Sequence, residues 1–292
     1  MKILKTEKSD FRKILGVRVD STSTSRVLTQ IQKKLLQGRK FYITTPNPEI
    51  VLKASKDRKL RDIIGRSFLA IPDGVGLQIA LKFLSMPKFS NRIVRKMVYP
   101  LQLLLSVIFG RKNVVKGREL MLNLFGLTNQ KKLKVYLLGA TKSVNAKAID
   151  KFRNEYSGAK IKGSSGPELN SNAKPLGKLQ EKLNREAVEE INRFAPSMLF
   201  VAFGCPKQEK WIAKWLPKLN VKMAMTVGGA LDYYAGVAKL PPKWMVRVGL
   251  EWLWRLIRPS YYQPRKRFSR VVNSVIVFPW KIFVYKLQNP KT

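Results

Sequence analysis

Short runs of β-branched and aromatic residues alternate along the chain with segments whose apolar residues recur every three or four positions. The strand-like runs are 41–44, 67–71, 133–138, 198–202 and 221–227, and the segments with helical spacing are 21–37, 48–55, 143–156, 176–194 and 207–215. The runs are almost continuously apolar, as in parallel strands covered on both faces. The pattern therefore predicts an α/β fold, a Rossmann-like, mainly parallel sheet with helices on both faces.

Turn-forming residues follow each predicted strand. These loops are Thr45-Pro46-Asn47, Asp73-Gly74, Gly139-Ala140, Gly204 to Gln208, and Gly228-Gly229. Any one of them could be an ordinary turn, because Gly, Pro, Asn and Asp are the usual turn formers. Open α/β sheets bind ligands at the carboxyl ends of their strands. The recurrence of such loops predicts that they converge on one cleft, with Gly139 and Gly229 among the residues that contact a substrate.

Residues 81–118 interrupt this alternation and form a basic, apolar insertion in a core predicted to span residues 1–240. The segment contains many Lys and Arg residues and no acidic residue, and it encloses the apolar run from Met97 to Phe109. That run is shorter than the about 20 apolar residues that span a bilayer, and Pro100 and Gln102 interrupt it. A segment lying at a membrane interface fits this composition, and so does a core helix with solvated charges.

Residues 241–292 form a second basic segment. An apolar stripe at helical spacing is made by Met245, Val248, Gly249, Trp252 and Leu256. Arg265-Lys266-Arg267 follows, and residues 271–285 then mix aliphatic and aromatic residues with Lys281. We expect a helical, basic, amphipathic appendage that binds a membrane surface.

The net charge and the Cys and His content limit which partners the protein can bind and which catalytic sites it can form. With 57 Lys and Arg against 18 Asp and Glu, the 292-residue chain carries a formal charge of +39, and it has one Cys and no His. A Ser/His/Asp triad, a zinc site with His ligands and a disulfide framework are excluded. The positive charge predicts a polyanionic partner: nucleic acid, anionic lipid or a phosphorylated substrate.

Among these partners, long aliphatic runs such as 101–109 favour a membrane over nucleic acid, whose surfaces pair basic residues with stacking aromatics. A basic nucleic-acid-binding protein that uses the sheet as a scaffold stays the alternative. The first 20 residues are interrupted by charges throughout and lack the apolar region of a secretory signal, which predicts a cytoplasmic protein.

Asp73 is the best-placed general base, because it lies between Pro72 and Gly74 at a strand end and the chain has no His. No Asp-x-Asp pair is present to hold a divalent metal, and the sequence has neither a dinucleotide-binding Gly-x-Gly-x-x-Gly nor a Walker A motif. We therefore expect no metal and no cofactor. Cys205 lacks a His to activate it, so we interpret it as a small filler rather than a nucleophile.

Five motifs in a fixed order resemble the WecG/TagA/CpsF family of bacterial glycosyltransferases. They are Thr45-Pro46-Asn47-Pro48-Glu49, Pro72-Asp73-Gly74-Val75-Gly76, Phe203 to Glu209, Val227 to Asp232, and Leu250 to Leu256. The resemblance implies metal-independent, inverting transfer of N-acetylmannosamine or a related sugar from a UDP-sugar to a polyprenyl-diphosphate-linked sugar. It also implies a peripheral location at the cytoplasmic face of the membrane, in the synthesis of surface polysaccharide or teichoic acid.

The same resemblance implies roles for individual residues. Asp73 is similar to the family's proposed base, Thr45 and Asn47 to its polar substrate pair, and Gln208 to a pocket amide. Arg255, Arg265 and Arg267 resemble arginines that contact the diphosphates, although extra residues around 260–262 leave open whether Arg258 or Arg270 takes that role instead. The expected partners are the UDP-sugar, the lipid-linked acceptor and an anionic membrane, without nucleic acid. Whether the protein is a monomer or a homo-oligomer is left open.

Overall fold

The computed structural model describes residues 11–110, 117–242, 244–245, 250–257 and 264–289. The strands are β1 (Phe11–Ile14), β2 (Val17–Asp20), β3 (Phe41–Thr44), β4 (Leu69–Ala70), β5 (Lys134–Gly139), β6 (Lys160–Ser164), β7 (Met198–Ala202) and β8 (Met223–Thr226). The helices are α1 (Thr24–Leu36), α2 (Pro48–Lys56), α3 (Arg58–Arg66), α4 (Val75–Ser85), α5 (Arg92–Phe109), α6 (Gly117–Gln130), α7 (Lys142–Glu155), α8 (Lys178–Phe194), α9 (Lys207–Trp215), α10 (Ala230–Tyr234), α12 (Glu251–Ile257), α13 (Pro264–Val272) and α14 (Phe278–Gln288), with a 3₁₀ turn η1 (Leu216–Lys218) and a π-helical turn η2 (Asn273–Val277).

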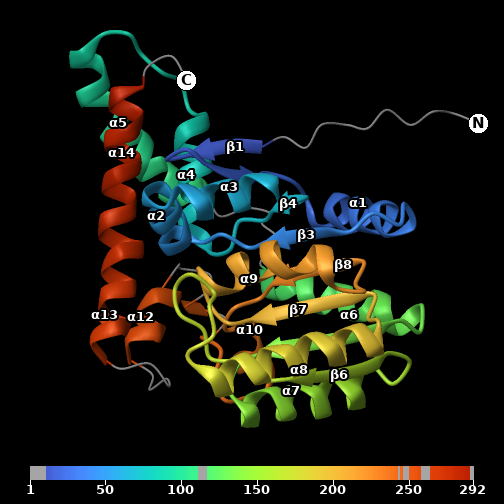
Figure 1. The fold of residues 1–292 in the computed structure, drawn as a ribbon. Coiled ribbons are helices and arrows are strands. Elements are labelled where there is room, and N and C mark those ends of the chain that lie inside the picture. The colour runs from blue at the N-terminus through green and yellow to red at the C-terminus, as the bar shows by residue number, and fades with distance from the viewer. Residues whose placement is uncertain (1–10, 111–116, 243, 246–249, 258–263, 290–292) are drawn as a thin grey trace, which may run out of the picture.

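Six strands form one parallel sheet in the order β4-β3-β8-β7-β5-β6 (Figure 1). The predicted α/β fold class is confirmed, and the five predicted strands lie next to one another. The sequence patterns did not predict β6 or the antiparallel hairpin of β1 and β2. In β6 the exposed Lys160 and Lys162 flank the single buried Ile161, so this edge strand lacks the continuous apolar character of the others.

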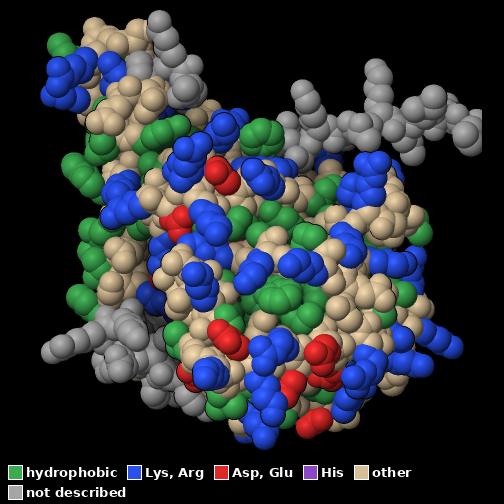
Figure 2. Space-filling model, viewed as in Figure 1, with side chains coloured by type: hydrophobic (Ala, Val, Ile, Leu, Met, Phe, Trp, Pro, Cys, Tyr) green, Lys and Arg blue, Asp and Glu red, His purple; other side chains and the backbone are tan. Residues whose placement is uncertain are grey.

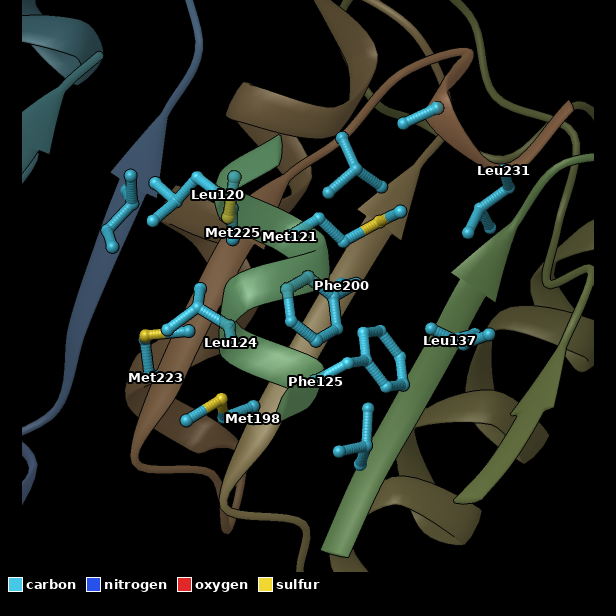
Figure 3. Packing of buried hydrophobic residues seen from close by; sticks show 14 of the residues in the cluster. Leu120, Met121, Leu124, Phe125, Leu137, Met198, Phe200, Met223, Met225 and Leu231 are labelled. Carbon is cyan, nitrogen blue, oxygen red and sulfur yellow. The ribbon is translucent and has the colours of Figure 1, made fainter. Parts of the chain in front are cut away.

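Helices cover both faces of the sheet. One face packs against α1, α6, α7 and α10, and the other against α8 and α9. In the first layer, α6 lies across β7 and β8 and inserts Leu124 and Phe125 among Phe200, Met223 and their neighbours (Figure 3). Phe125 stacks on Phe152 of α7 with 3.7 Å between ring centroids, and on Phe200 at 5.2 Å. A third apolar cluster joins the hairpin to α2, α3, α4 and the C-terminal helix.

The two basic segments that the sequence set apart lie against each other. Within residues 81–118, α5 includes Pro100 and does not end there. The helical run α13-η2-α14 contacts α2, α4 and α5 and follows the side of the molecule toward which the strands point (Figure 1). The helical character predicted for the C-terminal segment is thus confirmed, while Val248 and Gly249 of the predicted stripe lie outside the described residues. None of the helices among the described residues is both long and apolar enough to cross a bilayer.

Candidate functional site

The loop after β3 is joined to the end of β8 by Thr45. Its backbone N–H donates to Thr226 Oγ1 at 3.1 Å, and its hydroxyl donates to the Thr226 carbonyl oxygen at 3.0 Å. Both groups are buried. The hydroxyl proton of Thr45 is therefore used to hold two strand ends together.

Asn47 starts α2 from the same loop. Its Oδ1 accepts a hydrogen bond from the Ile50 N–H at 2.9 Å, and Pro48 occupies the first helical turn, where its missing N–H costs nothing. The Nδ2 group of Asn47 has no partner in the part of the chain that the structure describes. Asn47 thus keeps a donor for a ligand while it fixes the helix start.

Asp73 lies beside this loop at the end of β4. Its N–H donates to the Pro46 carbonyl at 2.7 Å, and its Oδ1 accepts from the Gly117 N–H at 3.1 Å. A side chain at position 117 would place its Cβ 2.9 Å from Thr45 Cγ2, so only glycine allows this approach. Asp73 is half-buried, and its Oδ2 accepts no hydrogen bond from a described residue. The geometry orients one carboxylate oxygen and leaves the other for a ligand.

Gln208, in the first turn of α9, connects the loops that follow β7 and β8. Its Oε1 accepts from the N–H groups of Gly204 at 3.2 Å and Gly228 at 3.1 Å, and its Nε2 donates to Glu209 Oε1 at 3.0 Å. The side chain is 2% exposed. In this arrangement the amide holds the backbone of the two loops together, whereas the sequence suggested that it contacts the substrate.

Burial raises the pKa values of two side chains next to Gln208. Burial raises the pKa of Glu209, although hydrogen bonds from Gln208 and Cys205 oppose the shift. Burial, and next the nearby Glu209, raise the pKa of the Cys205 thiol. A protonated, half-buried thiol is a poor nucleophile, which supports the interpretation of Cys205 as a filler.

The two glycines predicted to touch substrate differ. Gly139 has φ of +108°, and a Cβ there would lie 2.7 Å from the Ala202 backbone. Glycine at this position therefore allows β5 and β7 to lie close together. Gly229 is exposed at the start of α10, where a Cβ would lie 3.3 Å from Asp232 Oδ2. Only Gly229 therefore offers a surface to a ligand.

Of the C-terminal arginines considered for the diphosphates, the structure describes the side chain of Arg270. Arg255 lies in α12, and Arg265 and Arg267 lie in α13, but their side chains are outside what the structure describes. Arg270 of α13 forms an ion pair with Glu49 of α2, with 3.2 Å between Nε and Oε2. Glu49 is two residues from Asn47 along the chain, so this contact brings α13 close to the strand-end loops.

Two hollows on the surface lie elsewhere. One of 810 Å³ lies between α3 and α9 and is lined by five Lys and Arg side chains, and one of 330 Å³ is lined by residues of α7 and β6. Neither is formed by the strand-end loops, where open parallel sheets bind ligands. Over the described residues, no three His, Cys, Asp or Glu side chains are grouped so as to hold a metal ion.

Comparison with known proteins adds an independent finding. The model of the glycosyl transferase WecG/TagA/CpsF family matches residues 12–100 and 96–292. An N-acetylglucosaminyldiphosphoundecaprenol N-acetyl-beta-D-mannosaminyltransferase of Bacillus subtilis (strain 168) is 31% identical over 74% of this chain and 70% of its own length. Proteins with the same name from Bacillus spizizenii and Staphylococcus aureus (strain MRSA252) are each 27% identical, over 88% and 92% of this chain and 87% and 91% of their own lengths.

Proposed function

Because the chain belongs to the glycosyl transferase WecG/TagA/CpsF family, we propose that it transfers N-acetylmannosamine from a UDP-sugar to N-acetylglucosamine linked to undecaprenyl diphosphate. The names of the relatives state this acceptor and a β-mannosaminyl product. The observation in this chain that carries the proposal is the pair of neighbouring loops at the strand ends, where Asp73 and Asn47 each have a polar group without a partner among the described residues.

In the proposed reaction, the acceptor hydroxyl attacks the anomeric carbon while the bond from that carbon to the UDP oxygen breaks. Asp73 Oδ2 takes the hydroxyl proton, and the Gly117 N–H on Oδ1 keeps the carboxylate oriented. A single displacement on an α-linked donor inverts the anomeric centre and gives a β product. One carboxylate is then sufficient, because no covalent intermediate has to be formed and released.

The departing UDP carries negative charge, and positive groups converge on this edge. The helices α2, α4 and α9 all begin within a few residues of strand ends, so their N-terminal N–H groups and dipoles point there. Arg270 enters from α13, the helix that also carries Arg265 and Arg267. These charges support a reaction without a metal ion. We further propose that the enzyme meets its lipid-linked acceptor as a peripheral protein at the cytoplasmic face of the membrane, in the synthesis of a surface polymer.

The test is an assay of UDP release with a panel of UDP-sugars and an undecaprenyl-diphosphate N-acetylglucosamine acceptor. UDP release that depends on both UDP-N-acetylmannosamine and the acceptor, with a disaccharide-lipid product, is the expected result. Release that proceeds equally without acceptor indicates hydrolysis and contradicts the proposal. Efficient use of a different UDP-sugar corrects the donor but keeps the reaction class.

A further inference from the structure

Helix α5 presents an apolar stripe to the outside of the molecule. Ile93, Met97, Leu101, Leu104 and Ile108 have exposed fractions from 55% (Leu101) to 74% (Met97). At about 100° per residue, these five side chains occupy an arc of about 80° on the helix surface. We call them the α5 stripe. An apolar stripe this regular on a surface helix normally faces the core.

The opposite side of α5 is the one that packs on the protein, and it is partly polar. Tyr99, Gln102 and Ser106 are its buried residues. Gln102 Oε1 accepts a hydrogen bond from the buried Lys286 Nζ of α14 at 2.6 Å, and Gln102 Nε2 donates to the Pro87 carbonyl at 3.0 Å. The helix is thus attached to the fold by these polar contacts together with the buried Tyr99, which packs edge-on against Phe83, and the five side chains of the α5 stripe stay outside.

Helix α14 packs against the inward side of α5, where the Arg95 side chain donates to the Leu287 carbonyl and Gln102 meets Lys286. Phe278 and Ile282 of α14 are buried, whereas Trp280 of α14 and Ile276 of the preceding turn η2 are mostly exposed. Figure 2 shows hydrophobic side chains along the outer edge of the C-terminal helix, and Lys and Arg side chains gathered at the corner where α5 lies.

We propose that the α5 stripe is the surface by which this protein docks on an anionic lipid membrane. The exposed Arg92 and Lys96 flank the stripe, and residues 81–118 contain no acidic side chain that an anionic headgroup would repel. A second copy of the chain fits less well, because each copy carries a formal charge of +39. Nucleic acid would leave the aliphatic side chains of the stripe without a partner.

The same architecture connects the docked surface to the cleft. The helical run α13-η2-α14 contacts α5 at its C-terminal end, and near its start Arg270 pairs with Glu49 beside the candidate site. Docking through α5 therefore fixes the cleft relative to the lipid surface. This consequence for the acceptor rests on the proposed function, whereas the docking itself rests on α5 alone.

The experiment compares sedimentation of the full-length protein with vesicles of phosphatidylcholine containing about one-third phosphatidylglycerol. The test variant is Leu101→Glu/Leu104→Glu. The matched control is Leu36→Glu/Leu179→Glu, which places the same charges on α1 and α8 at sites that are 82% and 67% exposed. We expect the test variant to lower the vesicle partition coefficient by about tenfold or more, and the control to bind like the unmodified protein. Circular dichroism and thermal unfolding check that both variants are folded.

Equal vesicle binding by the test variant and the control overturns the proposal. So does light scattering that shows an oligomer of the unmodified protein dissociated by Leu101→Glu/Leu104→Glu, because the stripe would then be an interface between copies. The proposal is also wrong if RNA displaces the protein from vesicles and the test variant binds that RNA more weakly than the unmodified protein does. The stripe would then be a nucleic-acid-binding surface. Sugar transfer is measured separately. If vesicle binding depends on the stripe but the protein has no transferase activity, the docking proposal stands and the proposed function is wrong.

Discussion

Replacing Gln208 by Ala should destabilise the protein before it affects any substrate. The substitution removes the acceptor of two N–H groups, on Gly204 and Gly228, and the donor to the fully buried Glu209. Each buried polar group left without a partner costs roughly 1–3 kcal/mol. The two N–H groups are only partly buried, so we assign about 1 kcal/mol to each of them and about 1–3 kcal/mol to the Glu209 carboxyl oxygen. The total loss in the free energy of unfolding is then about 3–5 kcal/mol. Domains are stable by about 5–15 kcal/mol, so the change is large.

Urea unfolding followed by tryptophan fluorescence measures this loss, with Gln208→Glu as the matched control. The control keeps an oxygen that accepts from both glycine N–H groups but places a second buried carboxyl beside Glu209, so we expect it to be destabilised as well, and less so at low pH, where a protonated carboxyl can donate. If Gln208→Ala unfolds at the same urea concentration as the unmodified protein and yet loses UDP-sugar binding, the amide acts on the substrate directly and our assignment of a structural role is wrong.

Two further predictions concern metal independence and the C-terminal helix. Transfer should continue in excess EDTA, because the described residues offer no grouped metal ligands and cationic side chains and helix N-termini can neutralise the leaving group; loss of activity that magnesium restores would contradict this. Burial, and secondarily Lys88, lower the pKa of Lys286 from 10.5 to about 8, so the unfolded chain binds this proton more tightly. The free energy of unfolding should therefore rise between about pH 8 and pH 10.5, and denaturant titrations should show that contribution absent in Lys286→Met.

The sequence predicted what depends on local pattern. Five strands were visible because runs such as 198–202 are apolar throughout, and the loops after them contained Asp73 and Asn47. It could not predict contacts between distant positions. Thr45 meets Thr226 and Asp73 meets Gly117 only when the sheet order is known, because 181 and 44 positions separate them.

The sequence also did not predict which side of each basic segment would pack against the protein. Residues 92–109 are amphipathic, and an apolar stripe can face either the core or a membrane, so periodicity did not show which side would be buried. The inward side is fixed by Lys286, whose Nζ also donates to the Phe83 carbonyl at 2.6 Å, 203 positions away. Residues 271–285 were predicted as a separate anchor, yet Phe278 and Ile282 are core residues packed against the earlier segment.

The most direct test of the proposed reaction is the rate of sugar transfer by Asp73→Asn, measured together with its affinity for the UDP-sugar. Asparagine keeps an Oδ1 that can accept from the Gly117 N–H, so the loop and the donor pocket should persist. Our account predicts that transfer falls by about 100- to 10,000-fold while the dissociation constant of the UDP-sugar changes little. Transfer at close to the unmodified rate would show that Asp73 is not the base, and would direct the search to Glu49 or Asp232.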